Sequence, residues 1–265
     1  MTLSKQKPFA KRLATMLRVD ARRLLVSPLF YLMVGISLAM PILILVMTTM
    51  FGTTDATGGA TDAVAMEGFT NVWQIIGSVS TAEQSASMSL VSMCNVNMIY
   101  FAAAIFASIF VTEDFRSGFA KSLFTVRASK ADYVTSKTLI CWLSGVAMIL
   151  LFLIGSLIGG KIAGLSFALE GFTAANLVWC LLAKLLLVGI FSGAAVLAGA
   201  IAKHRRWVAI CAAFAFGMLL FAMIPIITPL DATAIHALLC AVGGAGFAAV
   251  FAVIAKLVLD KTTLV

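Results

Sequence analysis

Six apolar runs, each about as long as a bilayer is thick, constrain this chain more than any other feature of its sequence. They cover residues 29–51, 88–111, 138–159, 174–202, 207–227 and 235–257. A helix needs about 20 predominantly apolar residues to cross the hydrocarbon core, and lipid cannot hydrogen-bond an open backbone. The sequence therefore predicts an all-α, polytopic membrane protein with six transmembrane helices.

Composition supports the same class of protein. Of the 265 residues, 62% are hydrophobic and 11% are charged, whereas soluble domains carry about 25% charged residues. The formal net charge of +8 could suggest a nucleic-acid partner. The positions of the basic residues instead follow the pattern of membrane topology, so we expect membrane lipid and no nucleic acid as a partner.

The basic residues alternate with the apolar runs. All but two of the 19 Lys and Arg lie before the first run, between the second and third, between the fourth and fifth, or around the end of the sixth. Cytoplasmic segments carry the excess of Lys and Arg. We therefore expect both termini in the cytoplasm of a cell-membrane protein, with residues 1–28 as an N-terminal segment, 29–257 as the transmembrane domain and 258–265 as a tail.

The longest outer loop, residues 52–87, contains no Lys or Arg. Apolar side chains gather in its middle, and they favour a short amphipathic helix that rests on the membrane or caps the transmembrane domain, because aromatic rings need a place to bury. The alternative is a partly disordered loop. The apolar residues are Phe69, Val72, Trp73, Ile75 and Ile76.

The segment before the first run predicts an amphipathic interfacial helix over residues 9–26. Its apolar side chains share one face, and Arg18 and Arg22 project from the other, which is typical of a helix lying among lipid headgroups. Asp20 interrupts the apolar face. It could pair with Arg23, three residues on, or a protein partner could receive it.

The cytoplasmic segment between the second and third runs combines charges with aromatic residues. We expect a short helix over residues 115–124, broken at 125–129. Its apolar side chains are costly to leave in water, so they either dock on a protein or lie flat on the bilayer. The docking candidates are Glu113, Asp114, Phe115, Arg116, Gly118, Phe119, Lys121, Leu123 and Phe124, with Asp20 from the preceding helix.

The residues of this segment carry a family resemblance. An acid, a glycine, a lysine and a leucine are followed by a basic turn and a lysine at the start of the third run, at Glu113, Gly118, Lys121, Leu123, Arg127 or Lys130, and Lys137. This order resembles permease subunits of the type-two exporter class of ABC transporters, including antimicrobial-peptide (lantibiotic) immunity permeases. The six runs and the amphipathic segment before them also look like that family.

The resemblance implies a division of labour. Two permease chains would form the pathway, as a homodimer or heterodimer, and separate ABC ATPase subunits would bind ATP and Mg²⁺ and dock on residues 115–124 and on the N-terminal helix. The chain by itself would be no enzyme and would bind no cofactor or metal. The expected cargo is an amphipathic or hydrophobic peptide, lipid or drug, exported from the cell.

One phosphate-loop-like stretch does not change this expectation. Residues 155–162 nearly match G-x-x-x-x-G-K-[ST], but Ile162 stands where the Mg²⁺-binding hydroxyl is needed, and no soluble strand precedes the glycines. The histidines, His204 and His236, fall on opposite sides of the predicted membrane. ATP hydrolysis and a shared metal site are therefore not expected.

Lys184 is a charge inside the fourth run. Such residues usually face a cavity or a partner, so Lys184 is a candidate for lining the pathway and meeting an anionic group. Alternatively, it snorkels to the outer surface.

Two glycine pairs, Gly155 with Gly159 and Gly189 with Gly193, allow close helix approach, either within one chain or at a dimer seam.

Two other function classes fit an all-helical membrane protein. A stand-alone secondary transporter driven by an ion gradient usually carries acids or polar breaks near the middle of its spans, and here no Asp or Glu lies deep in an apolar run. A membrane-anchored assembly factor without transport is the other. Co-purification with an ATPase distinguishes the permease from both.

Overall fold

The computed structural model describes residues 9–52, 69–79, 95–125, 129–221 and 223–261. Its regular structure there is helical, apart from one isolated bridge between Asn71 and Ser166. The elements are α1 (Phe9–Val26), α2 (Pro28–Gly52), η2 (Val72–Ile75), α4 (Asn97–Arg116), α5 (Phe119–Thr125), α6 (Lys130–Ile162), α7 (Ala174–Ala202), α8 (Arg206–Phe221), α9 (Ile224–Ile227) and α10 (Ala234–Lys261).

Within the part of the chain that the structure describes, five helices are long and apolar enough to cross a membrane, as judged by length and composition. They are α2, α4, α6, α7 and α10, and α8 is a shorter apolar helix. The chain is thus an all-helical protein of the membrane type. The first, third, fourth and sixth predicted runs each lie within one of these helices, while residues 88–94 of the second run lie outside the described residues.

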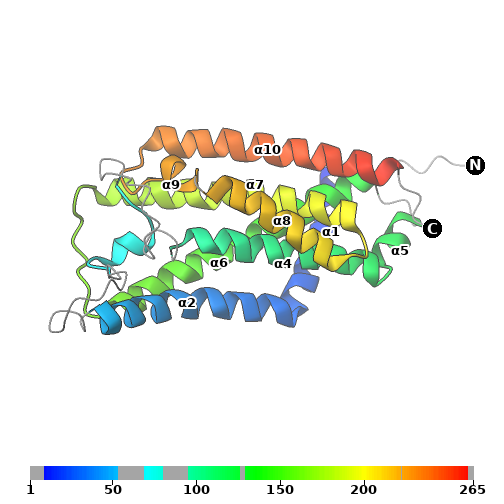
Figure 1. Ribbon diagram of the computed structural model, residues 1–265. Helices are drawn as coiled ribbons and strands as arrows, with labels where there is room; N and C mark the ends of the chain where they lie inside the picture. The colour runs from blue at the N-terminus through cyan, green and yellow to red at the C-terminus, as the bar shows by residue number, and fades with distance from the viewer. Residues whose placement is uncertain (1–8, 53–68, 80–94, 126–128, 222, 262–265) are drawn as a thin grey trace, which may run out of the picture.

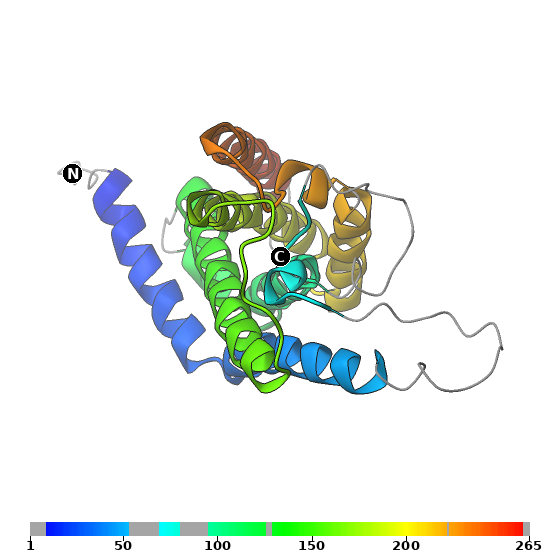
Figure 2. The ribbon, with the colours of Figure 1, turned by 90° about the vertical axis from the view of Figure 1, so that its left-hand side faces the viewer.

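The long helices run side by side, and α1 crosses one end of the bundle (Figure 1). In Figure 2, turned by 90° from Figure 1, α1 shows its full length at one edge of the molecule and slants past the end of the bundle. The same end holds α5 and the C-terminal end of α10. We call it the basic end, because the basic segments at the α1, α4–α6 and α7–α8 connections gather there.

The N-terminal helix has the predicted bounds, Phe9–Val26. Ser27 separates it from α2, which begins at Pro28, a residue suited to a first helical turn because it needs no amide hydrogen there. Met16, Leu17 and Leu24 pack against the core, whereas Arg18 and Arg22 are exposed. The apolar face of α1 therefore lies against its own chain, chiefly against α6.

Two predicted helices have different bounds in the structure. The predicted helix 115–124 is wrong, because α4 continues to Arg116 and α5 begins at Phe119. Gly118 between them has φ +73°, a conformation that favours glycine. The predicted run 207–227 divides into α8 and α9, and Pro225 lies in the first turn of α9, where it cannot extend a preceding helix.

The glycine pairs lie where helices of this chain approach closely. A Cβ atom added to Gly155 would lie 2.2 Å from the carbonyl oxygen of Leu38 in α2, and one on Gly159 would lie 2.8 Å from Cα of Ile42. A Cβ on Gly193 would lie 3.2 Å from Cα of Ala248. Both glycine pairs therefore support the alternative of packing within one chain.

The apolar middle of the outer loop covers the bundle end opposite the basic end. It forms one 3₁₀ turn, η2, with the side chain of Asn71 as N-cap. Phe69, Val72, Ile75 and Ile76 are buried, and the Trp73 Nε1–H donates to the Phe167 carbonyl at 3.1 Å. The structure thus favours the capping alternative for residues 69–79, while 53–68 and 80–87 lie outside the described residues.

Candidate functional site

Four charged side chains meet inside the basic end of the bundle. Asp20 and Arg23 come from α1, Asp114 from the last turns of α4, and Lys137 from α6. Asp114 and Lys137 are 0% exposed and Asp20 is 1% exposed. Burial of an ion is expensive unless a counter-ion and hydrogen bonds accompany it, so the pairing within this group determines what it can do.

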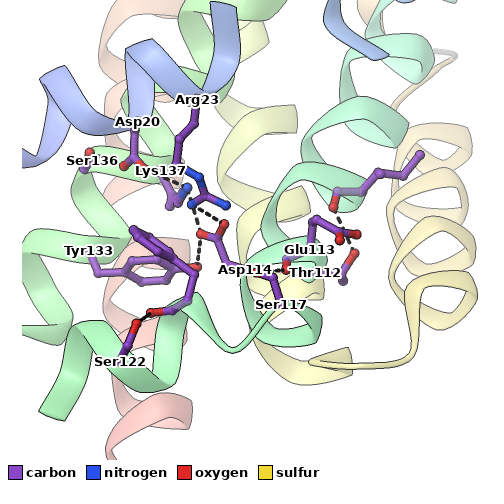
Figure 3. Close-up of polar contacts among 12 residues, drawn as sticks. Asp20, Arg23, Thr112, Glu113, Asp114, Ser117, Ser122, Tyr133, Ser136 and Lys137 are labelled. Carbon is purple, nitrogen blue, oxygen red and sulfur yellow. Dashed lines mark hydrogen bonds and ion pairs between the residues drawn. The ribbon is translucent and has the colours of Figure 1, made fainter. Parts of the chain in front are cut away.

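The four charges alternate in sign along a continuous chain (Figure 3). The Lys137 Nζ lies 2.7 Å from Asp20 Oδ1 and 2.7 Å from Asp114 Oδ2. The Arg23 Nη1 lies 2.6 Å from Asp114 Oδ1. We call the series Asp20–Lys137–Asp114–Arg23 the charge chain. Two acids balance two bases, so the group is formally neutral.

Hydrogen bonds from α6 complete the pairing of both carboxylates. The Ser136 hydroxyl donates to Asp20 Oδ2 at 2.6 Å, and the Tyr133 hydroxyl donates to Asp114 Oδ2 at 3.0 Å. Every carboxylate oxygen of Asp20 and Asp114 therefore has a cation or a hydroxyl beside it. A buried ion pair in which each charged atom has a partner holds its elements in one relative position.

Aromatic rings surround the two cations. The Lys137 Nζ lies 4.2 Å from the centre of the Phe110 ring, and the Arg23 guanidinium lies 4.0 Å from that of Phe119. Both distances are within the range of cation–π attraction. Phe119 begins α5, so Arg23 connects α1 to α5 as well as to α4.

The other loop aromatics pack on Tyr133. The ring centres of Phe115 and Phe124 lie 6.3 Å and 5.4 Å from that of Tyr133, both in edge-on orientations. The loop aromatics thus find apolar neighbours within the chain. The expectation that only a docked protein or the bilayer could cover them is therefore wrong for Phe115, which is buried, and weaker for the half-buried Phe119 and Phe124.

Further ion pairs tie neighbouring helices together around the charge chain. Arg12 of α1 lies 3.2 Å from Asp132 of α6. Lys130 of α6 lies 3.4 Å from Asp260 of α10 and donates to the Leu259 carbonyl at 2.7 Å. Arg206 of α8 pairs with Glu113 of α4. The basic end is therefore cross-linked from α1 through α4 and α6 to α8 and α10.

The predicted docking residues divide into two groups. The first group is buried or half-buried within the chain. Asp20 and Asp114 belong to the charge chain, and Phe115 is buried beside it. Phe119, Leu123 and Phe124 are half-buried. The remaining candidates are exposed along the end of α4 and the start of α5, at Glu113, Arg116, Gly118 and Lys121. We call these four the α4–α5 face.

Asp20 has neither of the partners expected from the sequence. Its carboxylate pairs with Lys137 and Ser136 of its own chain, while Arg23 pairs with Asp114. Sequence reasoning missed the roles of Arg23, Tyr133 and Ser136. A usable signal existed, because Tyr133, Ser136 and Lys137 share one helical face at spacings of three and four residues.

Lys184 lies toward the opposite end of the bundle from the charge chain. It is 0% exposed, and its Nζ lies 2.9 Å from the Thr228 hydroxyl oxygen. Thr228 donates its own proton to the Ile224 carbonyl at 2.8 Å, so its oxygen is free to accept from the ammonium group. Full burial does not fit the snorkelling alternative, in which the amine reaches the surface. Contact with an anionic cargo stays a prediction.

No group of three His, Cys, Asp or Glu suited to a metal ion occurs among the described residues. Because its charges are paired, the charge chain is suited to fixing the positions of helices rather than to supplying a reactive group.

No family model, curated protein or solved structure matches this protein.

Proposed function

We propose that this chain is the membrane-spanning permease subunit of an ATP-driven ABC transporter. A separate ATPase subunit would supply the energy, and the cargo would be an amphipathic or hydrophobic peptide, lipid or drug that is exported. The observation that carries the proposal is the charge chain, which fixes α1, lying across the bundle, to α4 and α6.

This arrangement suits a protein that receives mechanical work at one end. A partner that moves α5 also moves α1, because Arg23 contacts both Phe119 of α5 and Asp114 of α4. Lys137 passes the same displacement to α6, a helix of 33 residues that extends from the basic end through the bundle. Packed helices respond to such displacement as rigid bodies.

Six crossings belong to the proposal, with α8 and α9 together forming the fifth. The helix α8 alone has 16 residues, fewer than the roughly 20 that a bilayer core requires. α9 continues from α8 toward the end of the bundle where α10 begins (Figure 1). An even number of crossings also agrees with α1 and the end of α10 lying at the same end, which we assign to the cytoplasm.

The ATPase would dock on the α4–α5 face. Arg116 and Lys121 are exposed there, and Gly118 allows the chain to turn sharply between the helices. The α4–α5 face adjoins the charge chain, because the buried residues Asp114 and Phe115 lie between Glu113 and Arg116 in the sequence. A second copy of the chain would complete the pathway.

Purification of the tagged chain from its native membrane tests the proposal. We expect a soluble phosphate-loop ATPase to co-purify in stoichiometric amount and the complex to hydrolyse ATP, while the chain stripped of that subunit does not. ATP hydrolysis by the stripped chain would contradict the two-subunit arrangement. Substrate movement that needs an ion gradient and no ATP would instead assign the chain to the secondary transporters.

A further inference from the structure

A basic groove of about 520 Å³ opens at the surface of the basic end, apart from the charge chain. It lies where α7 turns into α8, beside the end of α4. Its lining combines four cationic or titratable side chains with two apolar ones, namely Arg116, His204, Arg205, Arg206, Trp207 and Val208.

The backbone and one acid hold the cations together. Lys203 follows the last residue of α7 and has φ +48°, and His204 and Arg205 then connect it to α8. Glu113 of α4 pairs with Arg206 and lies 3.8 Å from Arg116. Because one carboxylate faces two guanidinium groups and Arg205 is also exposed, the groove keeps a net positive charge.

An apolar surface continues from the groove along α8. Trp207 is 77% exposed and lies one residue beyond the arginines. Phe214, Met218 and Leu219 are exposed farther along the same helix. Trp at the end of a membrane helix usually lies at headgroup level, so the groove would lie at headgroup depth and the exposed side chains of α8 beside the acyl chains.

We propose that this groove binds an acidic glycerophospholipid. Arg205 and Arg206 hold the phosphodiester through charge-assisted hydrogen bonds, and the acyl chains lie along the exposed side of α8. An acidic protein surface would satisfy the arginines but would leave Trp207 and Val208 without an apolar environment. The inference requires that the chain is embedded in a membrane and does not depend on an ATPase partner.

Native mass spectrometry of the full chain in detergent, titrated with phosphatidylglycerol, measures the binding. The variant is Arg205→Gln with Arg206→Gln, and the matched control is Lys256→Gln with Lys261→Gln, which removes two exposed cations of α10 at the same end. Each basic residue near an anionic lipid contributes about 1 kcal/mol. We therefore expect the groove variant to bind phosphatidylglycerol roughly tenfold to thirtyfold more weakly.

The parent and the control should bind phosphatidylglycerol equally and prefer it to phosphatidylcholine. Inorganic phosphate should bind far more weakly, because it lacks the chains that contact α8. Equal losses in variant and control would overturn the inference, as would phosphate binding as tight as lipid binding. If Arg205→Gln alone, on an exposed side chain, loses ATPase association and keeps lipid affinity, the groove is a protein-binding site and the inference is wrong.

Discussion

Lys137 is the residue on which the charge chain depends, because its ammonium group is shared by Asp20 and Asp114. Replacing it with Met leaves two buried carboxylates without their common cation. Breaking a buried pair in this way costs about 3–5 kcal/mol. We expect Lys137→Met to lower the free energy of unfolding in detergent by that amount, measured by chemical denaturation.

The control for Lys137 is Arg18→Met on the exposed face of α1. Exposed charges away from special contacts change stability by about 0.5 kcal/mol or less. A loss in Lys137→Met no larger than that of the control would show that the charge chain does not hold α1 to the bundle.

Lys184 differs from Lys137 because its ammonium group contacts a neutral hydroxyl, that of Thr228, and not a carboxylate. Lys184→Met removes a buried charge and keeps a side chain of similar length, so we expect thermal stability to stay the same or rise. Thr228→Val keeps the amine and removes its acceptor, at a cost of about 1–3 kcal/mol. If Lys184→Met transports cargo at the full rate, Lys184 has no role in the pathway.

For single residues, the sequence indicated which charged side chains lie in apolar surroundings, but it did not indicate their partners. Asp20 was recognisable because an acid interrupts an apolar stripe. Its partner Lys137 lies 117 positions away on α6, and no local spacing rule connects the two. The pairing follows from the way α1 crosses the bundle, which is a property of tertiary packing.

Glycine residues of α6 allow the backbone of α2 to approach closely. A methyl group at Gly155 would overlap the Leu38 carbonyl and lie 2.8 Å from Pro41 Cγ. Overpacking of this kind costs about 1–3 kcal/mol. We expect Gly155→Ala to lower the free energy of unfolding by that amount, measured by thermal or chemical denaturation.

Gly35 of α2 is the matched control for Gly155, because an added Cβ there meets nothing within 4 Å. Gly35→Ala should be neutral or stabilising by up to about 1 kcal/mol, the helix-propensity difference. Equal effects at the two positions would mean that α2 and α6 do not approach closely at Gly155.

The apolar runs predicted where the long helices lie, because backbone groups in lipid must pair internally. For example, α7 has the predicted bounds. The ends of α6 were not predicted. It begins at Lys130, eight residues before the predicted start, because Tyr133, Ser136 and Lys137 are satisfied inside the bundle rather than in water. The division of the fifth run at α8 and α9 follows from Pro225, whose position inside the run was visible in the sequence.

Topology is the property of the whole molecule that membrane-impermeant labelling measures. In a cysteine-free background, cysteines at Lys11, Lys121 and Lys256 should react only from the cytoplasmic side, and one at Lys161 only from the other side. An odd number of crossings would place Lys256 opposite to Lys11. Labelling of those two positions from opposite sides would therefore contradict six crossings.

The central claim is that a separate ATPase docks on the α4–α5 face, and charge reversal there tests it most directly. Lys121 is exposed on α5, so Lys121→Glu should leave insertion and thermal stability unchanged. Lys256→Glu, on exposed α10, is the control. We predict that the ATPase co-purifying with the parent is retained by Lys256→Glu and lost from Lys121→Glu. Equal retention by all three, or the absence of any ATPase from the parent, would contradict the account.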